Sequence, residues 1–427
     1  MKTHIVILFT AFFSSTALAQ DQYTSPPIQP QEPILGWFQQ NSGNNGRFTH
    51  VFFKNRDTGY VKVGTTYTLY STNGGDSWQV YNDSIGVAEF KGDFGYGYSI
   101  KGLGWIGITV DNGKNWKNYN TGIDASDNYY FSSSSRGFCS AANFIGRSID
   151  GGKTWTLDTT NVGKISAFAA IDSMRIFAVG TKYVDPNPPH SYIESIFLTT
   201  DGGLTWKFAP REHIQNGGFD GVAVLDSLRA VFIASTIFSY FSGNMGYSLV
   251  PINFAGVTER HSLEGISASN ARNVTVVGEH GKIFRSYDGG INWQEQNSGT
   301  QNTLYGVMFI DSITGWAVGD GGIILHTTNG GFASVNRIKS DSLETQIFPD
   351  PARENLTLGM MLPVAQHISL SILDISGSIL MQPLTNVMES AGFHFIPLDI
   401  HSLASAGYIL KIQTERYQSV IKFTVVR

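Results

Sequence analysis

The stretch SIDGGKTW, residues 148–155, decides the fold because the chain repeats it. Taken alone, an acidic, glycine-rich turn closed by a tryptophan could hold a metal, serve a hydrolase or end a β-hairpin. The six clear copies start 38, 39, 51, 87 and 41 residues apart, and a degenerate copy lies in the longest gap. Seven copies about 43 residues apart are typical of four-stranded propeller blades. The other copies begin at Ser71, Thr109, Thr199, Ser286 and Thr327, with the degenerate SYFSGNMGY at Ser239.

The residues before each repeat predict short strands. In the last repeat, LYGVMFID (304–311), TGWAVG (314–319) and GGIILHT (321–327) are apolar or alternating runs separated by turn residues. No stretch shows the 3.6-residue period of an amphipathic helix, and the chain contains 47 glycines to form tight turns. This combination predicts an all-β fold whose main part is a seven-bladed β-propeller.

The two ends of the repeat region are expected to meet. The last repeat lacks the tryptophan that begins most outer strands, whereas WFQQNSG (37–43) matches WQEQNSG (293–299) after the Ser286 copy. We therefore expect the N-terminal strand to complete the last blade, which leaves no open blade edge. The outer strands would begin at Trp37, Trp78, Trp116, Trp155, Trp206, Trp293 and, in place of a tryptophan, Tyr247.

The N-terminal 19 residues have the form of a secretory signal peptide. Lys2 precedes an apolar segment, and Ala17-Leu18-Ala19 is a small-residue cleavage site. No later segment has the ~18 consecutive apolar residues of a membrane span. Cys139 is the single cysteine, so no internal disulfide is possible, and we expect it to be buried. The formal net charge of −5 gives no electrostatic reason to expect nucleic acid as a partner.

The repeat pattern ends near Val335, and the composition then changes. Residues 336–346 are polar and are predicted to form a linker, whereas the following 80 or so residues contain alternating strand-like runs such as ISLSILDISG (368–377). Strands at this spacing predict a small β-sandwich of immunoglobulin type. The predicted division is a signal peptide (1–19), a propeller (34–335), a linker (336–346) and a C-terminal domain (347–427).

The repeat pattern resembles the Asp-box, or BNR, repeat of sialidases, xyloglucanases and non-enzymatic propellers. The longer unit VMFIDSITGWAVGDGGIILHTTNGG (307–331) is similar to the propeller of the photosystem II assembly and stability factor family. The resemblance covers about residues 34–335, and it implies the fold more than a role in photosynthesis.

The tail resembles the type A C-terminal sorting domain of proteins exported by the type IX secretion system of Bacteroidetes. The opening Phe-Pro-Asp-Pro (348–351) replaces the usual Tyr-Pro-Asn-Pro, and the chain closes on a basic, apolar strand, 421–427. The resemblance implies export to the cell surface or medium, with the type IX secretion machinery as a partner. The matching residues include Pro349, Pro351, Gly377, Gly407, Tyr408 and Lys422.

The acidic residues of the repeats are expected to be structural. A calcium loop needs several oxygen ligands within one turn and a late bidentate Glu, which the repeats lack. Asp or Asn can instead accept backbone N–H groups across the turn, while Gly adopts positive φ and Trp packs between strands. We expect no metal and no cofactor. The predicted structural residues are Asn73, Asp111, Asp150, Asp201, Asp288 and Asn329, together with the outer-strand tryptophans.

Two function classes remain open. The leading hypothesis is a non-catalytic binding or scaffolding propeller whose ligand is an unknown glycan or protein. The alternative is a glycoside hydrolase or sialidase-like enzyme, although the Arg-Ile-Pro motif of Asp-box sialidases is absent from the sequence. A binding site is expected on the face formed by outer-to-inner and second-to-third strand connections. Its candidate residues are Arg47, Arg211, His213, Arg260, His261, His280 and Tyr305.

Overall fold

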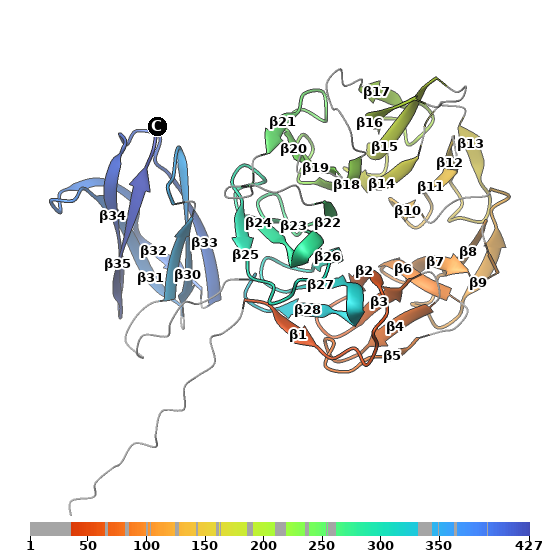
Figure 1. Cartoon of the computed structure of the whole chain (residues 1–427), viewed down its shortest axis with the longest axis horizontal. Helices are drawn as coiled ribbons and strands as arrows, with labels where there is room; N and C mark the ends of the chain where they lie inside the picture. The colour runs from red at the N-terminus through yellow and green to blue at the C-terminus, as the bar shows by residue number, and fades with distance from the viewer. Residues whose placement is uncertain are drawn as a thin grey trace, which may run out of the picture.

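The protein forms a ring of β-sheets with a β-sandwich beside it (Figure 1). The computed structural model describes residues 36–64, 67–81, 85–99, 101–102, 104–123, 128–141, 144–158, 162, 164–185, 191–209, 219–234, 239–252, 254, 262–331, 344–348, 350–362, 365–390 and 392–427. Within these ranges, the chain contains no helix with the length and apolar character of a membrane-spanning segment. The predicted signal peptide and residues 336–343 of the predicted linker lie outside the described residues. The last three residues predicted as linker, 344–346, instead belong to a strand of the C-terminal domain, because they pair with its next strand.

Seven four-stranded antiparallel sheets form the ring, and we number them as blades in chain order. Blade 1 contains β2 (Phe48–Phe53), β3 (Gly59–Val63), β4 (Tyr67–Ser71) and β5 (Gln79–Val80). Blade 2 contains β6 (Ile85–Lys91), β7 (Phe94–Ser99), β8 (Trp105–Thr109) and β9 (Lys117–Asn120). Blade 3 contains β10 (Tyr129–Phe131), β11 (Gly137–Ala141), β12 (Phe144–Ser148) and β13 (Thr156–Asp158). Blade 4 contains β14 (Ile165–Ala170), β15 (Ile176–Asp185), β16 (Ser191–Thr199) and β17 (Lys207–Ala209).

The remaining blades follow the same order, with one exception. Blade 5 contains β18 (Phe219–Val224), β19 (Ala230–Ala234), β20 (Ser239–Ser242) and β21 (Val250–Ile252). Blade 6 contains β22 (Leu263–Ala268), β23 (Val274–Gly278), the 3-10 turn η1 (Glu279–Gly281), β24 (Ile283–Ser286) and β25 (Gln294–Gln296). Blade 7 contains β26 (Leu304–Phe309), β27 (Gly315–Gly319), η2 (Asp320–Gly322) and β28 (Ile324–Thr327), and β1 (Phe38–Gln40) is its outer strand.

The N-terminal strand therefore closes the ring. Strand β1 pairs antiparallel with β28, and Phe38 lies opposite His326. The Trp37 indole N–H donates to Gln296 Oε1 of blade 6 at 2.8 Å, and Trp37 is 1% exposed. Gln40 in blade 7 occupies the position of Gln296 in blade 6. The Gln40 side-chain amide donates to the carbonyl of Gly74, and the Gln296 amide donates to the carbonyl of Gly330; each glycine is the first of the next Asp-box. This equivalence explains the match between WFQQNSG and WQEQNSG.

The hydrophobic core lies between neighbouring blades. One cluster joins Phe94, Tyr96 and Ile106 of blade 2 to Phe131 and Cys139 of blade 3. Each fully buried side chain of this size contributes roughly 1.5–3 kcal/mol, so adjacent blades stabilise one another around the whole ring. Cys139 is 0% exposed, and burial raises the pKa of its thiol to about 12.

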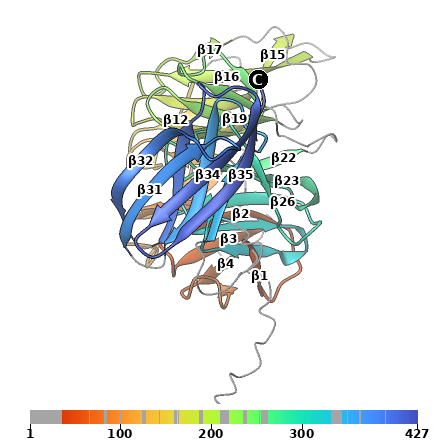
Figure 2. The same ribbon diagram turned by 90° about the vertical axis from the view of Figure 1, so that its left-hand side faces the viewer.

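The C-terminal domain is a sandwich of two antiparallel sheets. One sheet has the order β29-β30-β33, and the other has the order β32-β31-β34-β35. Apolar side chains from both sheets form a separate core that includes Leu358, Ile372, Leu410 and Phe423. Figure 2 shows the four-stranded sheet in front of the propeller. The strands are β29 (Glu344–Phe348), β30 (Asn355–Leu362), β31 (Gln366–Leu373), β32 (Ile379–Glu389), β33 (Gly392–Asp399), β34 (Ala406–Thr414) and β35 (Gln418–Val425).

Candidate functional site

The ring has two chemically different faces. The connection face carries the links from each outer strand to the next inner strand and the links between second and third strands. The two kinds of link are joined by backbone hydrogen bonds, such as Gly64 N–H to Arg47 O at 2.8 Å and Asp320 N–H to Thr303 O at 3.0 Å. The opposite box face carries the Asp-box turns, which bond to the turns between first and second strands, as in Gly151 N–Ser135 O at 2.9 Å.

The Asp-box turns are closed by their own hydrogen bonds. Ser148 Oγ accepts from Gly152 N at 2.8 Å and donates to Asp150 Oδ1 at 2.9 Å. The Asp150 carboxylate also accepts from the Thr154 backbone N–H at 3.0 Å and the Thr154 hydroxyl at 2.6 Å. Gly152 has a φ of 86°, and a Cβ there would lie 2.9 Å from the Phe131 ring. The acidic oxygens are thus occupied within the turn.

The same bonding recurs in the other repeats. The Ser or Thr hydroxyl donates to the acidic or amide side chain two residues later in the turns centred on Asn73, Asp111, Asp201, Asn244, Asp288 and Asn329. Each outer-strand tryptophan packs near a Phe, as in Trp155–Phe131, with ring centroids 6.0 Å apart. The corresponding pairs are Trp37–Phe309, Trp78–Phe53, Trp116–Phe90, Trp206–Phe138 and Trp293–Phe254. Among the described residues, no group of three or more His, Cys, Asp or Glu could hold a metal ion.

The degenerate fifth repeat corrects the sequence alignment. Its turn begins at Ser242, because Ser242 Oγ contacts Asn244 Oδ1 at 3.1 Å and Gly246 N at 2.8 Å. Leu249 therefore occupies the tryptophan position and packs against the blade 4–blade 5 core. Tyr247 is 64% exposed and does not lead the outer strand, so the prediction that it replaces the tryptophan is wrong.

On the connection face, a bulge occurs near the start of five inner strands. The strand register shifts across one residue in β2, β14, β18, β22 and β26. A bulge redirects the side chain of the extra residue. These extra residues are partly exposed, whereas the apolar residue before each is buried. They are Thr49, Ser166, Asp220, Glu264 and Tyr305.

Two predicted candidates, Arg47 and Tyr305, meet across the junction of blades 1 and 7. Arg47 Nε donates to Asp320 Oδ1 at 3.0 Å, and the Tyr305 hydroxyl donates to Asp320 Oδ2 at 2.9 Å. The Arg47 guanidinium also contacts the Tyr305 hydroxyl and lies 4.4 Å from the ring centroid. Burial opposes ionisation of Asp320, but hydrogen bonds from Arg47 and Tyr305 outweigh it and lower the pKa of that carboxyl.

This cluster is exposed enough to meet a ligand. The Arg47 and Asp320 side chains are 58% and 39% exposed. An ion pair at such exposure contributes only about 0–1 kcal/mol to stability. Its main consequence is therefore positional: the tyrosine and carboxylate hold the guanidinium in one orientation at the connection face.

Glu264 adds a carboxyl with unusual chemistry, and the sequence reasoning missed it. Burial raises the pKa of Glu264, and the charges of Asp220 and Glu279 raise it further, although Ser262 and Arg47 oppose the shift. The tripeptides Phe-Asp-Gly (219–221), Leu-Glu-Gly (263–265) and Leu-Tyr-Gly (304–306) were the available signal, because each places one polar residue between an apolar residue and a glycine.

His280 lies at a different place on the connection face. It belongs to η1 and has a φ of 55°, whereas Gly321 takes the matching position in η2 with a φ of 68°. His280 borders a hollow of about 590 Å³. The hollow is lined by polar groups of blade 6 and the following connection, including Lys282, Glu295, Asn297, Ser298 and Thr300.

The structure thus brings Arg47 and Tyr305 together, whereas His280 lines a hollow that includes neither of them. The other four candidates, Arg211, His213, Arg260 and His261, lie outside the described residues.

In the C-terminal domain, the two ends of the sorting motif are bonded together. The Thr424 backbone N–H donates to Asp350 Oδ1 at 2.8 Å, and Ala352 exchanges backbone bonds with Thr424 and Val426 at 2.8 and 2.9 Å. Asp350 thus accepts this bond in a position where the family usually has Asn. Pro349 lies outside the described residues, while Pro351 belongs to this junction.

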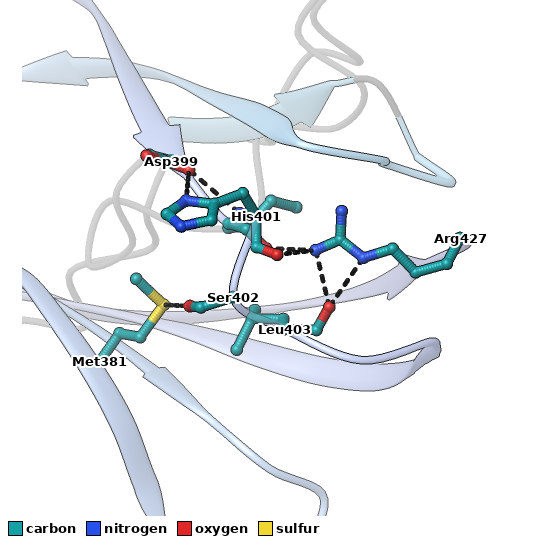
Figure 3. A network of polar contacts seen from close by, with 7 residues as sticks. Met381, Asp399, His401, Ser402, Leu403 and Arg427 are labelled. Atoms are coloured by element: carbon teal, nitrogen blue, oxygen red, sulfur yellow. Dashed lines mark hydrogen bonds and ion pairs between the residues drawn. The ribbon is translucent and has the colours of Figure 1, made fainter.

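The last residue extends this junction. Arg427 Nε donates to Leu403 O at 2.9 Å, and Arg427 Nη2 donates to Ile400 O at 2.8 Å and His401 O at 2.6 Å (Figure 3). His401 in the same loop contacts Asp399 at 2.6 Å. The terminal arginine therefore holds the connection between β33 and β34. The sequence pattern places Arg427 in the closing strand but contains no sign of this contact.

The other motif residues lie in turns and on the last two strands. Gly377 has a φ of 90° in the turn between β31 and β32. Tyr408 is 7% exposed, and its hydroxyl donates to Ala404 O at 2.8 Å. Lys422 and Gly407 both lie on exposed positions of the last two strands.

Comparison with known proteins agrees with both domains. Residues 253–353 match the sequence model of the family described as photosynthesis system II assembly factor YCF48. Residues 346–426 match the secretion system C-terminal sorting domain. No curated protein matches the chain.

Solved propellers are similar in fold at low sequence identity. YCF48 from Cyanidioschyzon merolae has a TM-score of 0.54 and 15% identity, covering 68% of this chain and 98% of its own. A structure of YCF48 bound to D1 peptide has a TM-score of 0.53 and 15% identity, covering 69% and 95%. These likenesses show the fold alone. Together with the two family matches, they confirm the resemblance seen in the sequence to a propeller of the YCF48 type followed by a type IX secretion C-terminal sorting domain.

Proposed function

We propose that this protein is an exported, non-catalytic propeller that binds a polypeptide segment on its connection face. The observation that carries the proposal is the Arg47–Tyr305–Asp320 cluster beside the bulged side chains of neighbouring blades. An oriented guanidinium and a phenol ring can bind backbone carbonyls, carboxylates and apolar side chains of an extended segment. A similar propeller is described with a bound peptide, which supports this ligand class over a glycan.

The test is peptide binding by the mature full-length chain. A peptide array would identify bound sequences, and fluorescence anisotropy would then give affinities. We expect Arg47→Ala to weaken binding at least tenfold. Arg56→Ala is a matched control, since Arg56 pairs with Asp311 at 3.0 Å across the same two blades, on the box face. Equal affinity of wild type and Arg47→Ala, or an equal loss in Arg56→Ala, would contradict the proposed site.

One observation favours the alternative, a glycoside hydrolase. A partly buried carboxyl with a raised pKa beside a second carboxylate is what acid catalysis of glycoside hydrolysis requires, and Glu264 with Asp220 has this character. A screen of glycoside substrates separates the two functions. Turnover that is abolished by Glu264→Gln would overturn the non-catalytic proposal.

The proposed location is the cell surface or the medium. We propose Sec-dependent export through residues 1–19, followed by type IX secretion through the C-terminal domain. Deletion of residues 346–427 should trap the propeller in the periplasm of a type IX-competent host. Fractionation and immunoblotting measure this outcome, and normal secretion of the truncated chain would overturn the proposed route.

A further inference from the structure

The four-stranded sheet of the sorting domain has an unusual outer face. Antiparallel sheets commonly bury one face and present polar residues on the other. Here, Leu373 lies opposite Ile379 on one side and Ile409 on the other, which forms an apolar row across three strands. Ile379 is 56% exposed, and Ile375 in the adjacent turn is 83% exposed. The outer-face patch consists of Leu373, Ile375, Ile379, Ile409 and Val420.

The pairing places this patch on the side away from the domain core. The neighbouring residues Ile372, Leu410 and Phe423 point inward and are buried. Successive residues of a strand point to opposite faces, so Leu373 and Ile409 point outward. Figure 2 shows β31, β34 and β35 in front of the propeller. The patch is therefore accessible while the propeller is folded.

Basic residues border the patch. Lys422 lies opposite Ile409, and Lys411 lies opposite Val420. Within the described part of the chain, neither lysine makes an ion pair. Asp374, in the adjacent turn, uses its carboxylate on Ser376 and on the Ser378 backbone N–H.

We propose that the outer-face patch is the surface by which a protein of the type IX secretion machinery binds this domain, and that the partner presents apolar side chains bordered by carboxylates. This inference rests on the proposed export by that machinery. Exposed apolar side chains gathered at one place mark a protein-binding surface. The two lysines favour a partner with carboxylates around its apolar contact residues. A second copy of the chain fits less well, since a two-fold pairing of this face would bring its basic borders together.

The motif residues fit the same surface. Gly377 forms the turn that carries Ile375, and Gly407 lies beside it, since a Cβ on Gly407 would be 3.9 Å from Ile375 Cγ2. Lys422 lies on β35 at the end of the row, opposite Ile409. Three motif residues that add little to the core therefore lie beside the exposed apolar side chains.

The experiment uses the full chain in a type IX-competent host. Ile375→Asn and Ile379→Asn are combined, and the secreted and periplasmic fractions are measured by immunoblotting. Met388→Asn is the matched control, because Met388 is 57% exposed on the same strand as Ile379 but at its other end. We expect the patch variant to lose at least tenfold in the secreted fraction, with periplasmic accumulation, and the control to be secreted normally.

A second variant guards against misfolding. Lys422→Glu leaves the apolar residues intact and should also reduce secretion severalfold. Both the patch variant and Lys422→Glu should unfold at the wild-type temperature, which shows that they fold. Normal secretion of the patch variant, while deletion of residues 346–427 blocks export, would overturn this inference and leave the export route standing. An equal secretion defect in Met388→Asn would also overturn the inference. So would a purified wild-type chain that forms a dimer, if the patch variant abolishes the dimer but is still secreted normally.

Discussion

The closure of the ring can be tested at Trp37. Replacing Trp37 with Ala removes a 1% exposed side chain that packs edge-to-face on Phe309, with ring centroids 5.7 Å apart. Truncation of a buried tryptophan costs about 3–5 kcal/mol. Trp37→Phe keeps most of the packing but leaves Gln296 Oε1 without the indole donor, which costs about 1–3 kcal/mol for a buried acceptor. Urea unfolding followed by tryptophan fluorescence measures both losses.

Trp155→Phe is the control for this prediction. The Trp155 indole donates to Gly152 O within its own turn at 3.0 Å, so its removal breaks a local bond. The Trp37 bond instead joins positions 259 residues apart. We therefore expect only the Trp37 variants to speed hydrogen exchange along β28, which pairs with β1. An unchanged unfolding midpoint in Trp37→Ala, or unchanged exchange in β28, would refute the assignment of β1 as the closing strand.

Three further predictions concern single side chains. Burial opposes ionisation of Asp201, but hydrogen bonds led by the Thr205 hydroxyl outweigh it and lower the pKa of Asp201 from 3.8 to about 2. The ionised carboxylate therefore stabilises the fold above pH ~4, and this contribution is lost as the pH falls through 2. Asp201→Asn should leave the free energy of unfolding at pH 7 nearly unchanged, because Asn73 already forms the same turn with Ser77. It should also weaken the pH dependence of the urea midpoint between pH 4 and 2. A large loss of stability at pH 7 would contradict this prediction. Cys139 should not react with a thiol reagent at pH 8 in the native protein and should react fully in urea; rapid native labelling would disprove its burial. Arg427→Ala should destabilise the sorting domain by about 1–3 kcal/mol in chemical unfolding, because charged hydrogen bonds are lost. The control Arg416→Ala should change the stability little, since Arg416 is exposed. Equal effects of the two substitutions would count against the structural role of the Arg427 contact.

The repeat architecture was predictable because each Asp-box is closed by local bonds. Ser148, Asp150 and Gly152 meet within five residues, so their pattern is visible in the sequence. The fifth copy is misaligned in the sequence when an aromatic residue is required at the tryptophan position. The turn itself requires a hydroxyl residue, followed two residues later by an acidic or amide residue and four residues later by a glycine. Ser242, Asn244 and Gly246 meet that requirement with Leu249 in place of tryptophan.

The candidate site was only partly predictable because its contacts are distant in sequence. Arg47 and Asp320 are separated by 273 positions, and only ring closure brings them together. Arg47 and Tyr305 were found because they lie next to predicted connections. Glu264 was not, since a bulge that redirects a side chain leaves one weak sign in the sequence, a polar residue between an apolar residue and a glycine. Asp320 lies in the turn η2, and its local sequence gives no sign of the contact with Arg47.

The contrast between the two faces is the reason to propose a binding site on the connection face. On the box face, the acidic or amide residue must satisfy the N–H groups of its own turn, so the repeats carry nearly the same residues in every blade. On the connection face, a bulged position requires only a partly exposed side chain, and its occupants range from Thr49 to Glu264 and Tyr305. Positions that are free of structural requirements can differ between blades, and a ligand that binds one side of a ring needs such differences. The residues that make the fold recognisable are therefore unsuited to specify the ligand, whereas the irregular positions can do so.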